Sequence, residues 1–162
     1  MKTFEELKEE LLNRAKNANA CQNGYKMGLD AKNKADLLKA ITANWFWVLI
    51  DARIVDAIYL EENFTEEELS EAGIYTRKCH EVRTVSFACG SATVKACGSA
   101  TVEAYDSATV KAYGSATVKA YDDSYVEDRT DNIRPESDYA IVKDYYNHKI
   151  YIRKGKFEII EV

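Results

Sequence analysis

The sequence predicts an α+β protein in which an N-terminal helical domain, residues 1–76, precedes a short β-solenoid, residues 77–162, capped by a C-terminal β-hairpin. Three observations lead to this fold class. Apolar residues recur at helical spacing in the first half. The composition changes to Val, Thr and Tyr, which favour strands, near residues 73–80. Residues 90–121 then repeat one eight-residue word four times, as GSATVKAC, GSATVEAY, DSATVKAY and GSATVKAY.

Length and composition describe a soluble protein without a basic surface for nucleic acid. The chain has 162 residues and a formal net charge of −5, spread over both halves. The N-terminus MKTFEELKEELL lacks the basic start and apolar core of a secretory signal. The longest apolar run, residues 45–50, is far shorter than the roughly 20 residues of a membrane span. The four cysteines show no CxxC spacing, so we expect a cytoplasmic protein with reduced thiols.

Two capping boxes mark helix starts in the first half. Thr3 and Glu6 can satisfy each other's backbone amides, and Thr65 and Glu68 repeat this pattern. The first box precedes an amphipathic helix with apolar residues at helical spacing. Gly73 can end the last helix in the left-handed conformation.

The stretch between the two boxes is less uniform. The polar segment 17–28 loosens the helical pattern, whereas segment 36–60 is apolar on nearly every side. Segment 36–60 therefore predicts one or two central helices, with a bend near Asp51. We expect the aromatic residues Trp45–Trp47 to form the heart of the helical core.

The repeated word fits a solenoid better than an antiparallel meander because its length is even. Its Ala and Val residues share one parity, and Ser, Thr, Lys or Glu, and Tyr or Cys share the other. A two-residue hairpin turn would put Cys97 and Ala100 on the same face and mix the two sets. A chain that turns a corner at each Gly-Ser or Asp-Ser keeps Ala-Val-Ala inside throughout.

Two words per coil is the simplest closure, and it stacks each position i on position i+16, about 4.8 Å away. Glu103 over Lys119 should attract, whereas Lys95 over Lys111 should repel. The outward ladders are Cys89 with Tyr105 and Tyr121 on one side and Cys97 with Tyr113 on the other.

The register persists beyond the last word. Asp138 lies 16 residues after Asp122, and segment 130–137, with the only proline, predicts a loop that replaces one side of a coil. The final HKIYIRKGKFEIIEV alternates about Lys154-Gly155 and predicts a hairpin. We expect this hairpin and the helical domain to cap the exposed ends of the solenoid.

Three segments carry a resemblance to known proteins: the SATVKAY and SATVEAY words, DLLKAITANWFW and the short GIY strand. They resemble a group of octapeptide-repeat β-solenoid proteins from gut bacteria and their phages and mobile elements, over residues 35–125. The resemblance implies a small accessory protein of a bacterium or phage and carries over no catalytic residue. Small phage proteins of this size often bind and block host machinery, including CRISPR effectors.

The sequence has no reaction signature, because it contains no P-loop, GxGxxG or HExxH motif. Cys79 and His80, together with His148, are the strongest metal candidates. Their spacing is not that of paired zinc ligands, and a buried thiol beside a surface imidazole is the favoured interpretation. We therefore expect no enzyme, no cofactor and no metal.

The outward Tyr and Lys positions of the words are the candidate partner-binding residues. Tyrosine is enriched in protein interfaces, and a regular Tyr-Lys face can also stack bases or sugars. The alternative is that these side chains only cover the strands. The candidates are Tyr105, Tyr113, Tyr121, Lys95, Lys111 and Lys119.

Two acidic patches form a second candidate surface that could mimic the phosphates of a nucleic acid. They are Glu61-Glu62 with Glu66–Glu68, and Asp122-Asp123 with Glu127-Asp128. Charge runs are usually only solvated surface, which is the alternative interpretation.

These observations favour a non-enzymatic protein that docks on a bacterial protein or nucleoprotein, as a phage-type, anti-CRISPR-like inhibitor of host defence. The negative net charge argues against direct nucleic-acid binding, and no membrane partner is expected. The alternative is a structural or adhesive solenoid that forms homo-oligomers through its ends or binds polysaccharide.

Overall fold

A computed structural model describes residues 1–130 and 133–160 of the chain. It contains two compact units, Met1–Ala72 and Gly73–Val162. The first unit is helical and the second is a parallel β-solenoid, so the predicted α+β class is confirmed.

The division between the units falls slightly before the predicted boundary at residues 76 and 77. The short strand β1 (Ile74–Tyr75) explains this position, because it pairs in parallel with β3 (Val85–Ala88). Strand β1 therefore belongs to the solenoid although it directly follows the last helix.

Residues 1–72, all of which the structure describes, form five α-helices and one π-helical segment. The elements are α1 (Phe4–Asn17), α2 (Gln22–Asp30), α3 (Lys34–Ala43), η1 (Trp47–Asp51), α4 (Ala57–Asn63) and α5 (Glu66–Glu71).

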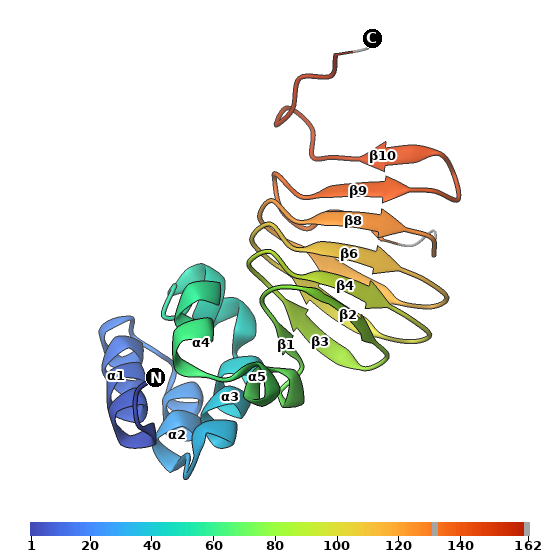
Figure 1. The fold of residues 1–162 in the computed structure, drawn as a ribbon. Coiled ribbons are helices and arrows are strands. Elements are labelled where there is room, and N and C mark those ends of the chain that lie inside the picture. The colour runs from blue at the N-terminus through green and yellow to red at the C-terminus, as the bar shows by residue number, and fades with distance from the viewer. Residues whose placement is uncertain (131–132, 161–162) are drawn as a thin grey trace. The chain divides into compact units, whose positions relative to one another are not determined.

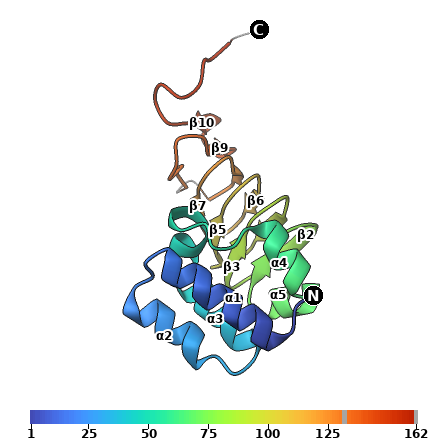
Figure 2. The same cartoon turned by 90° about the vertical axis from the view of Figure 1, so that its left-hand side faces the viewer.

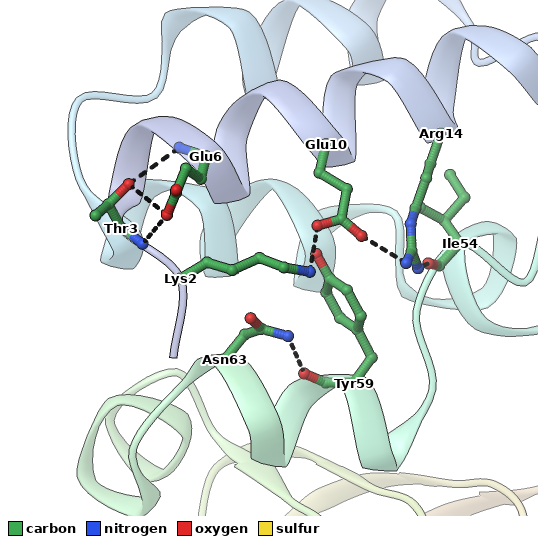
Figure 3. Close-up of polar contacts among 8 residues, drawn as sticks. All are labelled: Lys2, Thr3, Glu6, Glu10, Arg14, Ile54, Tyr59 and Asn63. Carbon is green, nitrogen blue, oxygen red and sulfur yellow. Dashed lines mark hydrogen bonds and ion pairs between the residues drawn. The ribbon is translucent and has the colours of Figure 1, made fainter.

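Both predicted capping boxes are present. The Glu6 amide donates to Thr3 Oγ1 at 3.3 Å, and the Thr3 amide donates to Glu6 Oε2 at 2.9 Å (Figure 3). The Thr65 and Glu68 pair has the same two bonds, at 3.1 and 2.8 Å. Gly73 follows α5 with a φ of +74°, the left-handed conformation expected of it.

Two expectations for this unit are wrong. The first is that segment 17–28 interrupts the helical pattern, because this segment contains most of α2, whose two glycines weaken the helical signal. Cys21 caps this helix by accepting from the Gly24 amide at 3.3 Å. The second is that all residues of Trp45–Trp47 lie in the core; Trp45 is buried, but Phe46 is 42% exposed. Consecutive helical residues cannot all face one core.

A network of charged side chains connects α1 to the segment that follows η1 and to α4 (Figure 3). Glu10 pairs with Lys2 and accepts from Arg14 at 2.6 Å. Arg14 also donates to the carbonyl oxygen of Ile54 at 2.7 Å, and its guanidinium lies 4.4 Å from the ring centroid of Tyr59. The hydrogen bond from Lys2 lowers the pKa of Glu10. Burial, followed by the charge of Glu10, raises the pKa of Tyr59 to about 12.

The solenoid unit is built from short strands, most of them parallel, which alternate between two sheets from β1 to β8 (Figure 1). One sheet has the order β1-β3-β5-β7, and the other has the order β10-β9-β8-β6-β4-β2. The remaining strands are β2 (Cys79–Val82), β4 (Thr93–Ala96), β5 (Thr101–Ala104), β6 (Thr109–Ala112), β7 (Thr117–Ala120), β8 (Tyr125–Asp128), β9 (Ile141–Asp144) and β10 (Lys149–Tyr151).

The register and core of the solenoid follow the parity of the words. Val94 pairs with Val110, and Val102 pairs with Val118, so each coil advances the chain by 16 residues as expected. The Ala and Val residues of the four words are at most 4% exposed and form one core between the sheets. Side chains this small let the two sheets approach closely.

The corners of the coils use left-handed backbone, which glycine adopts without steric cost. Gly90, Asp106 and Asp122 stack at one corner with φ of 61°, 52° and 48°, and Gly98 and Gly114 stack at the other with 63° and 67°. Asp106 Oδ2 accepts from the Gly90 amide at 2.9 Å, and Asp122 Oδ2 accepts from the Asp106 amide at 3.3 Å. Aspartate thus offsets its backbone strain by bonding to the coil below.

The predicted hairpin is displaced. Strand β10 runs antiparallel to β9, and the turn between them is closed by Asp144, which accepts from the amides of Tyr146 and Asn147 at 2.9 Å each. A turn does occur at Lys154-Gly155, but residues 156–160 form no strand after it. The early turn leaves β10 as the last strand that the described residues add to the sheet.

The predicted loop 130–137 interrupts the four-stranded sheet after β7. Pro135 forms an isolated bridge with Ala120, and Ile133 is buried at 2% exposure, so the loop closes the core where a strand would otherwise lie. Residues 131–132 of this loop, and residues 161–162 of the predicted hairpin, lie outside the described residues.

Candidate functional site

The six candidate binding residues do not form one surface. Lys95 and Lys111 lie on strands of the six-stranded sheet, and Tyr113 follows directly after β6. Lys119 lies on the four-stranded sheet, and Tyr105 and Tyr121 each follow a strand of that sheet. Words that alternate between two sheets necessarily divide identical positions between two faces of the solenoid.

On the four-stranded side the prediction is wrong for Tyr105, which is fully buried. Its ring stacks on Tyr121 with centroids 4.8 Å apart and an interplanar angle of 10°, so the predicted ladder exists but is not an open surface. The Tyr105 hydroxyl donates to Glu103 at 2.9 Å, and Lys119 donates to the same carboxylate at 2.9 Å. Burial, followed by the charge of Glu103, raises the pKa of Tyr105 well above its usual range.

The expected attraction between Glu103 and Lys119 is therefore confirmed, and it has a structural role. Glu103 holds both the Tyr105 hydroxyl and the Lys119 ammonium group, and the hydrogen bond to Glu103 raises the pKa of Lys119. This side of the solenoid satisfies its own charged groups.

The six-stranded side presents a different arrangement. Lys95 is exposed and lies in register with Lys111, as predicted. Lys111 forms an ion pair with Glu127 on the next strand, at 3.2 Å. This pair offsets part of the repulsion between the two lysines.

Cations and tyrosine rings alternate beside these lysines. The Arg129 guanidinium lies 5.9 Å from the ring centroid of Tyr113, in the preceding coil, and 4.6 Å from that of Tyr145, in the following coil. The ammonium group of Lys143 lies 4.7 Å from the Tyr145 centroid. Such distances are those of cation–π contacts. We call this surface the cationic face, and it comprises Lys95, Lys111, Tyr113, Arg129, Lys143 and Tyr145.

Three residues of the cationic face were missed by the sequence reasoning. Arg129, Lys143 and Tyr145 lie after the last intact word, but their register relates them to predicted candidates. Arg129 lies 16 residues after Tyr113, and Lys143 continues the strand positions of Lys111 and Glu127. Extending the 16-residue register past residue 121 would have found them.

The candidate metal ligands are far apart along the six-stranded sheet. Cys79 and His80 lie on β2 at one edge, whereas His148 lies in the turn before β10 at the other. The expectation of a buried thiol is wrong, because Cys79 is exposed. His80 Nε2 lies 2.9 Å from the carbonyl oxygen of Arg77, and its ring contacts Tyr75 at 4.5 Å. Within residues 1–130 and 133–160, no three His, Cys, Asp or Glu side chains gather as a metal site.

The second acidic patch is largely used within the solenoid. Asp128 is fully buried and accepts from the amide of Thr130 at 2.7 Å and from that of Ile133 at 3.2 Å. Glu127 pairs with Lys111, and Asp122 accepts from the corner amide of the preceding coil. These interactions leave a much weaker acidic surface than the sequence run predicts.

The part of the chain that the structure describes contains no helix with the length and apolarity needed to cross a membrane. Comparisons of the chain with protein-family models, with curated proteins and with solved structures found no match.

Proposed function

We propose that the protein is a non-enzymatic binding protein whose cationic face docks on an acidic surface of a bacterial protein or nucleoprotein. The observation that carries this proposal is the stack of Tyr113, Arg129 and Tyr145. Its three residues directly follow β6, β8 and β9, strands whose spacing is fixed by the backbone ladder. The exposed Lys95 lies on β4, the strand that neighbours β6.

The physical argument rests on preorganisation. Tyr and Arg are enriched among the residues that dominate interface energies. A guanidinium held between two rings loses little rotational freedom when it binds a carboxylate. Four cations on this face stand against two outward carboxylates of the same sheet, Glu81 and Glu127. Glu81 is paired with Arg83, and Glu127 with Lys111. The excess of cations favours a partner with negative charge.

Within this proposal the protein acts as a phage-type inhibitor of a bacterial defence nucleoprotein, in the manner of anti-CRISPR proteins. The resemblance of the repeat words to proteins of phages and mobile elements supports this assignment. Inhibition by docking requires a rigid surface and no reaction centre, which agrees with the sequence and with the ladder of short strands.

The test is capture of a partner from bacterial lysate by the wild-type protein, followed by variants that change the cationic face. Lys95→Glu combined with Arg129→Ala should lower the affinity for that partner by at least about tenfold, because it removes two charged contacts. Lys26→Glu combined with Lys32→Ala changes two exposed lysines of the helical unit by the same total charge and serves as the charge-matched control. If the double variant folds and binds as tightly as the wild type, the cationic face is not the docking surface.

The alternative function, self-association through the solenoid ends, is favoured by one observation. Strand β10 is the outer strand of its sheet, and Ile150 at its centre is 63% exposed. An edge strand with an exposed apolar residue can pair with a second copy. Concentration-dependent oligomers in light scattering would support this function if Ile150→Lys abolishes them. Retention of the protein on a glycan column would support polysaccharide binding instead.

A further inference from the structure

The helical unit contains an apolar cavity of about 280 Å³ bounded by α1, α2, α3 and η1. Helix α2 lies against α1 and α3 (Figure 2). Its residues Gly24, Tyr25 and Gly28 line the cavity. Protein interiors rarely contain voids much larger than a water molecule. An apolar cavity of about 150 Å³ is large enough to bind benzene, so this cavity has room for a larger molecule.

The sequence of α2 explains why the cavity is open. This helix contributes no buried side chain to the unit, and it carries Gly24 and Gly28 one helical turn apart. A Cβ atom on Gly28 would lie 3.3 Å from Leu12 Cδ2, and one on Gly24 would lie 3.2 Å from Asn44 Oδ1. At the two glycines, helix α2 therefore lies close to its neighbours. The space beside these contacts stays unfilled because α2 buries none of its side chains there.

The lining determines which molecules fit. Its residues lie between positions 11 and 54, all within the described part of the chain, and none of them carries a charge. Leu12, Ala40 and Trp47 provide apolar walls from three different elements. Burying an ionised group against such walls is costly, so carboxylates and amines are excluded.

A few polar groups stand at the edge of the cavity. Cys21 is exposed and Tyr25 is half-buried, which marks the side from which solvent reaches the cavity. Asn44 also lines it, with its Nδ2 group donating to the carbonyl oxygen of Ala40 at 2.9 Å. An apolar pocket with few polar groups is the usual composition of a small-molecule site.

We propose that this cavity binds a small, uncharged aromatic molecule of one or two fused rings. The volume sets the size, the uncharged lining excludes ions, and the rings of Tyr25 and Trp47 supply offset or edge contacts to an aromatic ligand. This site lies entirely within the helical unit, so it is independent of docking by the cationic face.

The first experiment titrates the full-length protein with indole and follows binding by NMR and calorimetry. We expect saturable binding, with shift changes confined to residues of α1, α2, α3 and η1. Ala40→Phe places a ring inside the cavity and should abolish binding, whereas Ala43→Phe, on the exposed side of the same helix, should leave it unchanged. Indole-3-acetate should bind at least about tenfold more weakly, because its carboxylate finds no cation.

A second measurement does not depend on a folded variant. Indole should slow the alkylation of Cys21, which lines the cavity, and should not affect Cys79, an exposed thiol of the solenoid unit. The proposal is overturned if indole, phenol and naphthalene all fail to bind the wild type. Binding that Ala40→Phe leaves intact, or equal protection of both thiols, would also overturn it.

Discussion

Replacing Val110 with alanine tests the inside–outside assignment of the solenoid most directly. Val110 is fully buried between Val94 and Val126 of the neighbouring coils. The substitution removes two methyl groups from the core, which costs about 1.6 kcal/mol in transfer free energy at about 0.8 kcal/mol each. Closely spaced backbone ladders leave little room for collapse, so the remaining cavity should raise the loss of unfolding free energy towards about 3 kcal/mol.

The matched control is Val85→Ala. Val85 is the same residue type on a strand of the same solenoid, but it has the outward parity and is 62% exposed, so its loss should stay below about 0.5 kcal/mol. Urea denaturation followed by circular dichroism in the strand region measures both variants. Tryptophan fluorescence follows the helical unit separately, because both tryptophans lie there. The assignment is refuted if the two substitutions cost the same.

Two further predictions concern charged side chains. Glu10→Gln should destabilise the helical unit at neutral pH by about 0.5 to 1 kcal/mol, as expected for a partly exposed ion pair, whereas Glu9→Gln should not; tryptophan-detected urea denaturation compares them. The folded pKa of Glu10 is lowered, so the Glu10 carboxylate stabilises the fold above its unfolded pKa of about 4.3. This stabilisation disappears as the pH falls through the folded pKa. The unfolding free energies of the two variants should therefore converge in acid. At the coil corner, Asp106→Gly should hardly change the unfolding free energy, whereas Asp106→Ala should lower it by about 1 to 2 kcal/mol. Alanine keeps the strain of a left-handed φ and loses the bond to the Gly90 amide. Thermal or urea denaturation measures both variants, and equal losses would contradict this account.

The solenoid could be predicted because its sequence repeats one physical constraint. Each word requires Ala-Val-Ala to face inward, and coils with two words each are the simplest that satisfy that requirement in every repeat. The structure confirms this down to the pairing of Val94 with Val110. The helix starts at Thr3 and Thr65 could be predicted because a capping box is a local interaction between residues three apart.

Features that depend on distant contacts could not be predicted in this way. Helix α2 has two glycines and no buried residue, so neither propensity nor periodicity indicated it. The final hairpin turns early because the buried carboxylate of Asp144 closes a local turn, although alternation predicted a turn at Lys154-Gly155. Parity likewise placed Tyr105 outward but could not show that its ring is covered.

The candidate site shows the same division between repeated and individual features. A perfectly repeated word would stack lysine on lysine along each sheet, which is unfavourable for stability because like charges repel. In this chain the later words break the ladder, with Glu127 after Lys111 and Arg129 after Tyr113. Each change places a complementary group beside a repeated one. The intact words therefore build the scaffold, and the altered words create the mixed ionic and aromatic surface that we propose as the docking face.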